Sequence, residues 1–189
     1  KNLPHQWNNL NTLYSALEVV RNLIENNIPL TDENFGEHLT RSGIYLPNDK
    51  SLTVDEYLEA QKDKTASNRG YYTASRDTRR FFQLLGFITV YEDKTAEISP
   101  AAKELLNADT EEEKQHLWKS AFLNLGLEGT DGEISHPYRV LIKLVNKLPG
   151  IKTKKLMLAL EAENDSDEEF ERILALAEKP YDEIVEEIG

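Results

Sequence analysis

Apolar residues recur at three- and four-residue spacing along most of the chain, the pattern of helices that bury one face. The longest such segment covers residues 7–27 and ends at two asparagines that are followed by Pro29. Shorter helices are predicted over residues 31–43, 54–62, 101–106, 110–125, 138–148, 154–161, 167–177 and from 180 onward. A serine or threonine precedes five of them as a candidate N-cap: Thr31, Thr53, Ser99, Ser135 and Thr153. The sequence therefore predicts a mainly α-helical protein.

One segment departs from the helical pattern. Residues 87–91 are β-branched and aromatic, residues 92–95 predict a turn, and residues 96–98 can return antiparallel. This hairpin follows a predicted helix that starts at Thr73 or Ser75 and runs to Gly86, while the polar residues 63–70 before it predict a loop. Helices followed by such a hairpin form the order of a winged helix-turn-helix. The helix would be the recognition helix and the β-hairpin the wing.

The Gly-rich, acidic stretch 127–133 is the candidate domain boundary. We then expect residues 1–134 to form a winged-helix subdomain, the type of fold that DNA-recognition subdomains use, and residues 135–189 to form a second helical, helix-turn-helix-like subdomain. At the end of the chain one helix face is apolar and has no obvious cover: Tyr181, Ile184, Val185 and Ile188. We therefore expect the second subdomain to be truncated, as a piece of a longer polypeptide.

Composition narrows the class of protein. The chain has 189 residues, 39% of them apolar, and no Cys, which excludes a disulfide scaffold and Cys-ligated zinc. No apolar run approaches the ~18 residues of a membrane span, so we expect a cytoplasmic protein with no membrane partner. The net charge of −12 arises mainly in residues 156–189, which carry twelve Asp/Glu against two Lys/Arg. A local basic face elsewhere is compatible with this overall acidity.

The predicted helix 73–86 has such a face. Its apolar side carries two phenylalanines, and the opposite side carries Arg76, Arg79, Arg80 and Gln83. Arg can pair with guanine and Gln with adenine in a major groove, and further arginines can contact phosphates. Further candidate DNA-binding residues precede the helix, lie in the hairpin turn or start a later helix: Asn68, Arg69, Tyr71, Tyr72, Lys94, Lys152, Lys154 and Lys155. The alternative for the arginines is a solvated face paired with Asp77 and nearby Glu. For Lys152, Lys154 and Lys155 it is a solvated N-terminal turn that balances nearby acidic residues.

The run TASRDTRRFFQLLGFI from Thr73, with ISPAAKELL from Ile98, resembles the N-terminal recognition region of type IIS restriction endonucleases. The AlwI-type and nicking enzymes are most similar, and FokI is more distant; the segment SHPYRVLIKLVNKLPGIKTKKL from Ser135 resembles their second subdomain. The resemblance covers residues 67–177. It implies double-stranded DNA as partner, with contacts from Ser75, Arg76, Arg79 and Arg80. It also implies a C-terminal nuclease domain or nuclease subunit that uses Mg²⁺. The acidic segment 156–189 departs from the pattern, which leaves DNA contact by the second module open.

No catalytic or metal-binding constellation is predicted in this chain, so Mg²⁺ would belong to the implied nuclease domain. Such a nuclease centre needs an Asp and a strand with Glu-x-Lys. Asp49 with Glu92 and Lys94 matches only superficially, because Asp93 stands where the strand needs an apolar residue. The histidines are scattered without ligand spacing: His5, His38, His116 and His136. Four large aromatic residues are expected in the core: Trp7, Trp118, Phe122 and Tyr138.

Two other functions remain open at this point. The acidity of the chain favours a non-catalytic winged-helix module that binds another protein. A transcription regulator has the same element order, although it would normally be a complete, dimerising chain.

We expect that the isolated chain does not cut DNA in the presence of Mg²⁺, because it lacks a carboxylate–lysine centre. Incubation with supercoiled plasmid, followed by electrophoresis, measures nicking and linearisation. Cleavage that disappears on Glu92→Gln or Lys94→Ala would show that residues 92–95 are catalytic and not only a turn.

Overall fold

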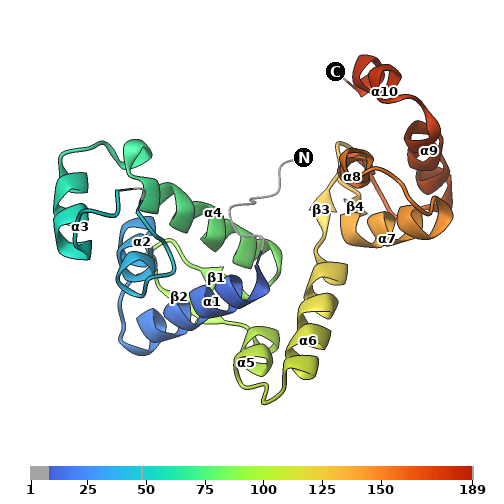
Figure 1. Ribbon diagram of the computed structural model, residues 1–189. Helices are drawn as coiled ribbons and strands as arrows, with labels where there is room; N and C mark the ends of the chain where they lie inside the picture. Colours follow the sequence, from blue (N-terminus) through green and yellow to red (C-terminus); the bar gives the residue numbers. More distant parts are fainter. Residues whose placement is uncertain (1–8, 48, 189) are drawn as a thin grey trace. The chain divides into compact units, whose positions relative to one another are not determined.

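The computed structural model describes residues 9–47 and 49–188 (Figure 1). Over these residues the regular structure is mainly helical, as predicted, with two short antiparallel hairpins. The described chain forms two compact units, residues 9–117 and 118–188, and the division falls within helix α6 (Glu111–Asn124). The sequence instead suggests a boundary after residue 134. The difference arises because the Gly-rich stretch is the turn of a hairpin that belongs to the second unit.

The first unit contains the elements that the hydrophobic pattern predicts. They are α1 (Leu10–Glu25), α2 (Asp32–Arg41), α3 (Val54–Lys62), α4 (Gly70–Leu84), β1 (Ile88–Val90), β2 (Ala96–Ile98) and α5 (Pro100–Leu106). Thr31, Thr53 and Ser99 cap α2, α3 and α5 as predicted, each accepting a backbone N–H of the first turn. His5, Trp7 and the first residues of the predicted helix 7–27 lie outside the described residues.

The core of this unit lies between α1, α2 and α4. Phe35 and Phe82 are fully buried there. Helix α2 packs along α4 so closely that a Cβ atom on Gly36 would lie 2.4 Å from the ring of Tyr71. A glycine inside a helix is costly, and here the close approach of the two helices requires it.

Strands β1 and β2 pair antiparallel with Ile88 opposite Ile98, which confirms the predicted hairpin. In its turn Lys94 has a φ of +68°, and the Asp93 carboxylate accepts the Thr95 backbone N–H at 2.9 Å. The Leu30 N–H, between α1 and α2, donates to the Lys94 carbonyl at 2.8 Å. The turn is therefore fixed to the loop before α2.

The segment before α4 differs from the prediction. Residues 66–68 form a 3₁₀ turn where a loop was expected, and α4 begins at Gly70 rather than at Thr73 or Ser75. The earlier start is explained by Tyr71, which is only 2% exposed and extends the buried side of α4 by one turn. Gly70 allows this start, because a Cβ atom there would lie 2.2 Å from the Tyr45 hydroxyl.

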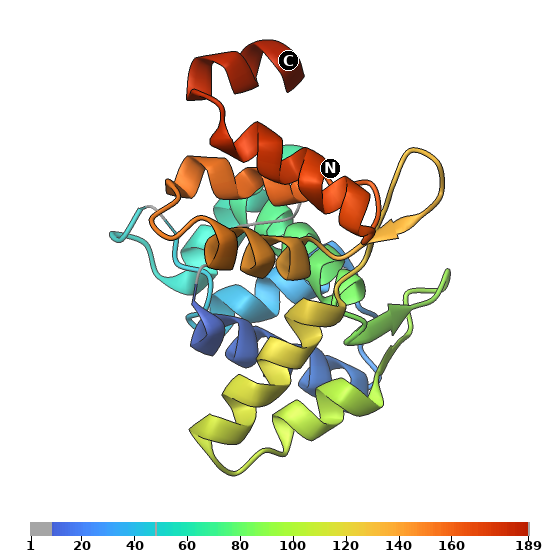
Figure 2. The same ribbon diagram turned by 90° about the vertical axis from the view of Figure 1, so that its right-hand side faces the viewer.

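The second unit follows the end of α6 (Figure 2, yellow to red). Its further elements are β3 (Leu127–Glu128), β4 (Ile134–Ser135), α7 (Pro137–Lys147), α8 (Thr153–Leu156), the 3₁₀ helix η2 (Met157–Glu161), α9 (Asp167–Glu178) and α10 (Tyr181–Ile188). Its core is built from α7, η2, α9 and α10 around Leu144 and Ile173. Trp118 is 2% exposed and stacks on Phe122, whose ring centroid lies 4.9 Å from that of Tyr138.

Three predictions for this unit are wrong in detail. Ser135 does not cap α7; it lies in β4, and its hydroxyl donates to the Leu127 carbonyl at 3.5 Å. Thr153 is the first residue of α8 and not its cap. The predicted helix 154–161 is a single α-helical turn followed by η2. Of the C-terminal apolar face, Ile184 is buried and the other three residues are exposed.

No helix in the described ranges is long and apolar enough to cross a membrane.

Replacing Phe82 by Ala should lower the free energy of unfolding of the first unit by about 3–5 kcal/mol, because the fully buried ring leaves a cavity. Its ring centroid lies 6.4 Å from that of Phe87, directly before β1, so the hairpin should loosen as well. Urea unfolding followed by circular dichroism measures the loss. The matched control is Leu46→Ala, at a side chain that is 71% exposed. Equal stability of both variants would contradict the burial of Phe82 in the core of the first unit.

Candidate nucleic-acid interface

Helix α4 has one buried and one accessible side, as its sequence pattern predicts. Ala74 and Phe82 are fully buried, and Phe81 is 8% exposed. The opposite side carries Arg76, Arg80 and Gln83, of which Arg80 and Gln83 are exposed. These three residues follow each other at spacings of four and three and therefore line one side of the helix. We call this set the α4 face.

Arg79 lies at the edge of the α4 face and is fixed by α2. Its Nε donates to the Asp32 carboxylate at 2.7 Å, and the two side chains are 20% and 12% exposed. Its Nη1 donates to the Gln83 amide oxygen at 2.9 Å. Arg79 therefore joins α2 to α4 and also orients Gln83.

The two other arginines differ in their surroundings. Arg76 Nε lies 3.2 Å from an oxygen of Asp77, and both side chains are partly exposed. Arg80 is exposed and has no hydrogen bond or ion pair with any residue of the described chain. Two of the three arginines are thus paired with Asp, as a solvated face would require, and the third retains its full donor capacity.

Three residues predicted as DNA contacts have partners in the packing of α2 against α4, and their contact with DNA stays a prediction. Ser75 is fully buried, and its hydroxyl lies 2.5 Å from the Asp32 carbonyl oxygen. Both carboxylate oxygens of Glu33 accept from Arg69 Nη1, at 2.9 and 2.8 Å. Tyr71 donates to Glu33 at 2.5 Å. Burial, and then this hydrogen bond, raise the pKa of Tyr71 to about 12, which keeps the hydroxyl protonated.

The remaining candidates of the first unit stay accessible. Asn68 is exposed in the 3₁₀ turn, and Tyr72 is half-buried at the start of α4. Lys94 is exposed at the hairpin turn, held there through its backbone. The accessible set in this unit is therefore the α4 face together with Asn68, Tyr72 and Lys94.

In the second unit the three candidate lysines have different roles. Lys155 donates to the carbonyls of Ala177 at 2.7 Å and Lys179 at 2.6 Å, so it caps the end of α9. Its ammonium group is thus already hydrogen-bonded within the unit, and its role as a phosphate contact stays a prediction. The Lys154 ammonium lies 5.4 Å from the centroid of the Tyr181 ring, and Lys152 is exposed.

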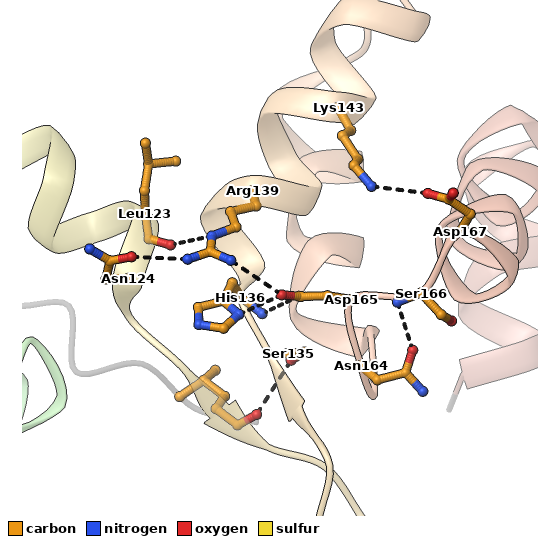
Figure 3. A network of polar contacts seen from close by, with 11 residues as sticks. Leu123, Asn124, Ser135, His136, Arg139, Lys143, Asn164, Asp165, Ser166 and Asp167 are labelled. Atoms are coloured by element: carbon orange, nitrogen blue, oxygen red, sulfur yellow. Dashed lines mark hydrogen bonds and ion pairs between the residues drawn. The ribbon is translucent and has the colours of Figure 1, made fainter.

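Sequence reasoning missed a polar clasp in the second unit (Figure 3). The Asp165 carboxylate accepts the His136 backbone N–H at 2.7 Å, and its other oxygen lies 2.6 Å from His136 Nδ1. Arg139 Nη1 lies 3.6 Å from Asp165, and Arg139 Nε donates to the Leu123 carbonyl at 2.7 Å. The clasp joins the end of α6, the start of α7 and the segment before α9. The only signal of this clasp in the sequence was Asp165 itself, which lies between Asn164 and Ser166 in the segment that separates two predicted helices.

The clasp has the geometry of a structural contact. Partial burial raises the pKa of Asp165, but hydrogen bonds from His136 and the charge of Arg139 outweigh it, so the pKa is lower than usual. The described residues include no group of three or more His, Asp or Glu side chains placed to hold a metal ion. The arrangement therefore stabilises the unit, and the α4 face remains the best candidate for a functional site.

Comparison with family models, with curated proteins and with solved structures gives no match to this chain. The resemblance to type IIS restriction endonucleases thus stays a prediction from the sequence.

Asp165→Asn should destabilise the second unit at neutral pH, because the amide cannot replace the charged partner of His136 and Arg139. A carboxyl whose pKa is lowered by folding contributes stability above its unfolded pKa of about 3.9, and this contribution is lost as the pH falls through the folded value. The difference between wild type and variant should therefore be full at pH 7 and shrink below about pH 4. Urea midpoints at several pH values measure it. A difference that is independent of pH would contradict the charged clasp, and Asp167→Asn, at an exposed end of α9, is the matched control.

Proposed function

We propose that this chain binds double-stranded DNA through the α4 face. In this proposal α2 and α4 form a helix-turn-helix into which α3 is inserted, and the β1–β2 hairpin is the wing. Two features support it: the order of elements, and the backbone bond from Leu30 to Lys94 that joins the α1–α2 loop to the hairpin. The accessible side of α4 would then enter the major groove.

The observation that carries the proposal is the exposed Arg80 between Arg76 and Gln83, which has no hydrogen bond or ion pair within residues 9–47 and 49–188. A guanidinium has five donors, and in Arg80 none of them is used by these residues, so they can pair with guanine or phosphate. Gln83 is held by Arg79 through its oxygen, which leaves both amide hydrogens as donors toward a base. Gln83 is thus ordered before DNA binds, which reduces the entropy that this side chain loses on binding.

Charge sets the expected strength of this binding. Asp32, Glu33 and Asp77 neutralise three of the arginines on and around α4, so the local excess of positive charge is small. Few phosphates would be neutralised, and the salt dependence should be shallow compared with that of strongly basic DNA-binding domains. Specific contacts by Arg80 and Gln83 would have to supply the rest of the affinity.

The wider context is also part of the proposal. The DNA-binding region would serve as the target-recognition part of a type IIS restriction endonuclease or nickase, with Mg²⁺-dependent cutting by a nuclease domain or subunit. A second candidate function is binding to another protein through the same side of α4. The pairing of Arg76 and Arg79 with aspartates favours this second function. Arginines that are already neutralised lose little solvation free energy when a neutral partner covers them.

We expect Arg80→Ala to weaken binding to a mixed-sequence duplex and to reduce the slope of log affinity against log salt by about one, if Arg80 contacts phosphate. If Arg80 contacts a base, the loss should be about 5- to 150-fold on a selected cognate duplex and confined to one base pair. Fluorescence anisotropy over a salt series, before and after selection from a random duplex pool, measures both.

The matched control is Arg21→Ala, at a partly exposed arginine of α1 that pairs with Glu18. Arg79→Ala serves as a second comparison. It should destabilise the first unit by about 1–3 kcal/mol, because the Asp32 carboxylate, whose side chain is 12% exposed, loses its ion-pair partner. Equal duplex affinity of wild type, Arg80→Ala and Arg76→Ala/Arg80→Ala would contradict the proposal and favour the protein-binding function.

A further inference from the structure

The α4 face contains one amide side chain, Gln83, and the structure fixes which end of that amide is accessible. The Gln83 amide oxygen accepts from Arg79 Nη1 at 2.9 Å. A guanidinium has donors and no acceptor, so the amide oxygen, and not the NH2 group, lies next to Arg79. The Gln83 side chain is exposed and has no other hydrogen bond within residues 9–47 and 49–188. Its accessible end therefore carries two hydrogen-bond donors.

Arg79 keeps the amide in this orientation because Arg79 is itself fixed. Its Nε donates to the Asp32 carboxylate at 2.7 Å, and the two side chains are mostly shielded from water. Turning the Gln83 amide over would place its NH2 group against the guanidinium, with donor facing donor. The Gln83 oxygen therefore stays engaged with Arg79 as long as the ion pair between Arg79 and Asp32 is intact.

The only carboxylate of α4 is occupied as well. Asp77 accepts from Arg76 Nε at 3.2 Å. Thr73, one turn before Arg76, has a hydroxyl that can either donate or accept, so it does not select between bases. The side chains that α4 offers to a ligand are thus mainly donors.

Donors in the major groove pair with acceptors on the base edges. Guanine presents two neighbouring acceptors there, N7 and O6, whereas adenine presents the acceptor N7 and the donor N6. A Gln side chain forms two hydrogen bonds with adenine only if its oxygen accepts from N6, and the Gln83 oxygen already accepts from a positively charged group. A second donor at this oxygen would lie beside the positive charge of Arg79, which disfavours adenine. Guanine requires no acceptor from Gln83.

We propose that Gln83 reads guanine and not adenine, and that Arg79 is a positioning residue that sets this preference through Gln83. The inference rests on the proposed binding of DNA through the α4 face. It differs from the pairing with adenine that the residue type alone suggests. The ligand is then a duplex with a G·C base pair at the position that Gln83 contacts.

Selection from a random duplex pool, with wild type and with Gln83→Met, identifies this base pair as the position at which the variant loses its preference. Wild type should select guanine there, and a duplex with adenine at that position should bind about 5- to 150-fold more weakly. Replacing this guanine by 7-deazaguanine removes the N7 acceptor. The replacement should weaken binding of wild type several-fold and leave binding of Gln83→Met unchanged.

Gln83→Lys separates the two ways of reading the base. Lys has donors only, so this variant should retain the preference for guanine, whereas recognition of adenine through the amide oxygen would be lost. The substitution is at an exposed position and leaves the ion pair between Arg79 and Asp32 in place. It therefore tests the inference in a folded chain.

Arg79→Met tests the positioning role. Without the guanidinium the Gln83 oxygen can accept from adenine N6, so the preference at this base pair should shift from guanine toward adenine. A loss of stability alone would weaken binding to all duplexes alike. Arg76→Met is the matched control, because Arg76 lies on the same side of α4 and has no bond with Gln83. It should leave the preference at this position unchanged.

Selection of adenine by wild type at the position of Gln83 would overturn the inference, although binding through the α4 face would stand. Loss of the guanine preference in Gln83→Lys, or an unchanged preference in a folded Arg79→Met chain, would also overturn it. Binding to no duplex at all would contradict the proposed function together with this inference.

Discussion

The contact between α2 and α4 is the constraint on which the first unit depends. Gly36 lets the helices approach until Tyr71 fills the space that a side chain would need. At the same contact the Ser75 hydroxyl meets the Asp32 carbonyl, and the Asp32 carboxylate binds Arg79. Each bond fixes the rotation of α4 about its axis. The side of α4 that faces away from α2 is therefore set by packing, and Arg80 lies on that side.

The acidic first turn of α2 explains how so acidic a chain can present ordered arginines. Asp32 and Glu33 stabilise the start of α2 through the helix dipole, and their carboxylates also bind Arg79 and Arg69. In the free chain these ion pairs fix Arg79 and Arg69 against α2. Arg80 has no hydrogen bond or ion pair with the described residues, and the proposed binding through the α4 face rests on it.

Local signals in the sequence predicted most of the fold. Thr31 and Thr53 mark their helices because a cap depends only on neighbouring residues, and the β1–β2 hairpin follows from alternation and a polar turn. The sequence is a poor guide where the environment of a side chain depends on residues that are distant in the chain. Glu33 accepts from Arg69, and the Asp32 carbonyl accepts from the Ser75 hydroxyl, so two candidate DNA contacts have intramolecular partners that the sequence did not indicate. No local pattern reveals such partners.

Nitrogen-15 NMR of the arginine Nε–H groups, with and without a mixed-sequence DNA duplex at low salt, tests the central claim most directly. In the free chain the Arg79 Nε–H, bonded to Asp32, should exchange slowly with water, and the exposed Arg80 Nε–H should exchange rapidly. On addition of duplex the account predicts a shift and slower exchange for Arg80, with Arg79 little changed. Saturating duplex that leaves Arg80 unchanged, or a fast-exchanging Arg79 in the free chain, would contradict it.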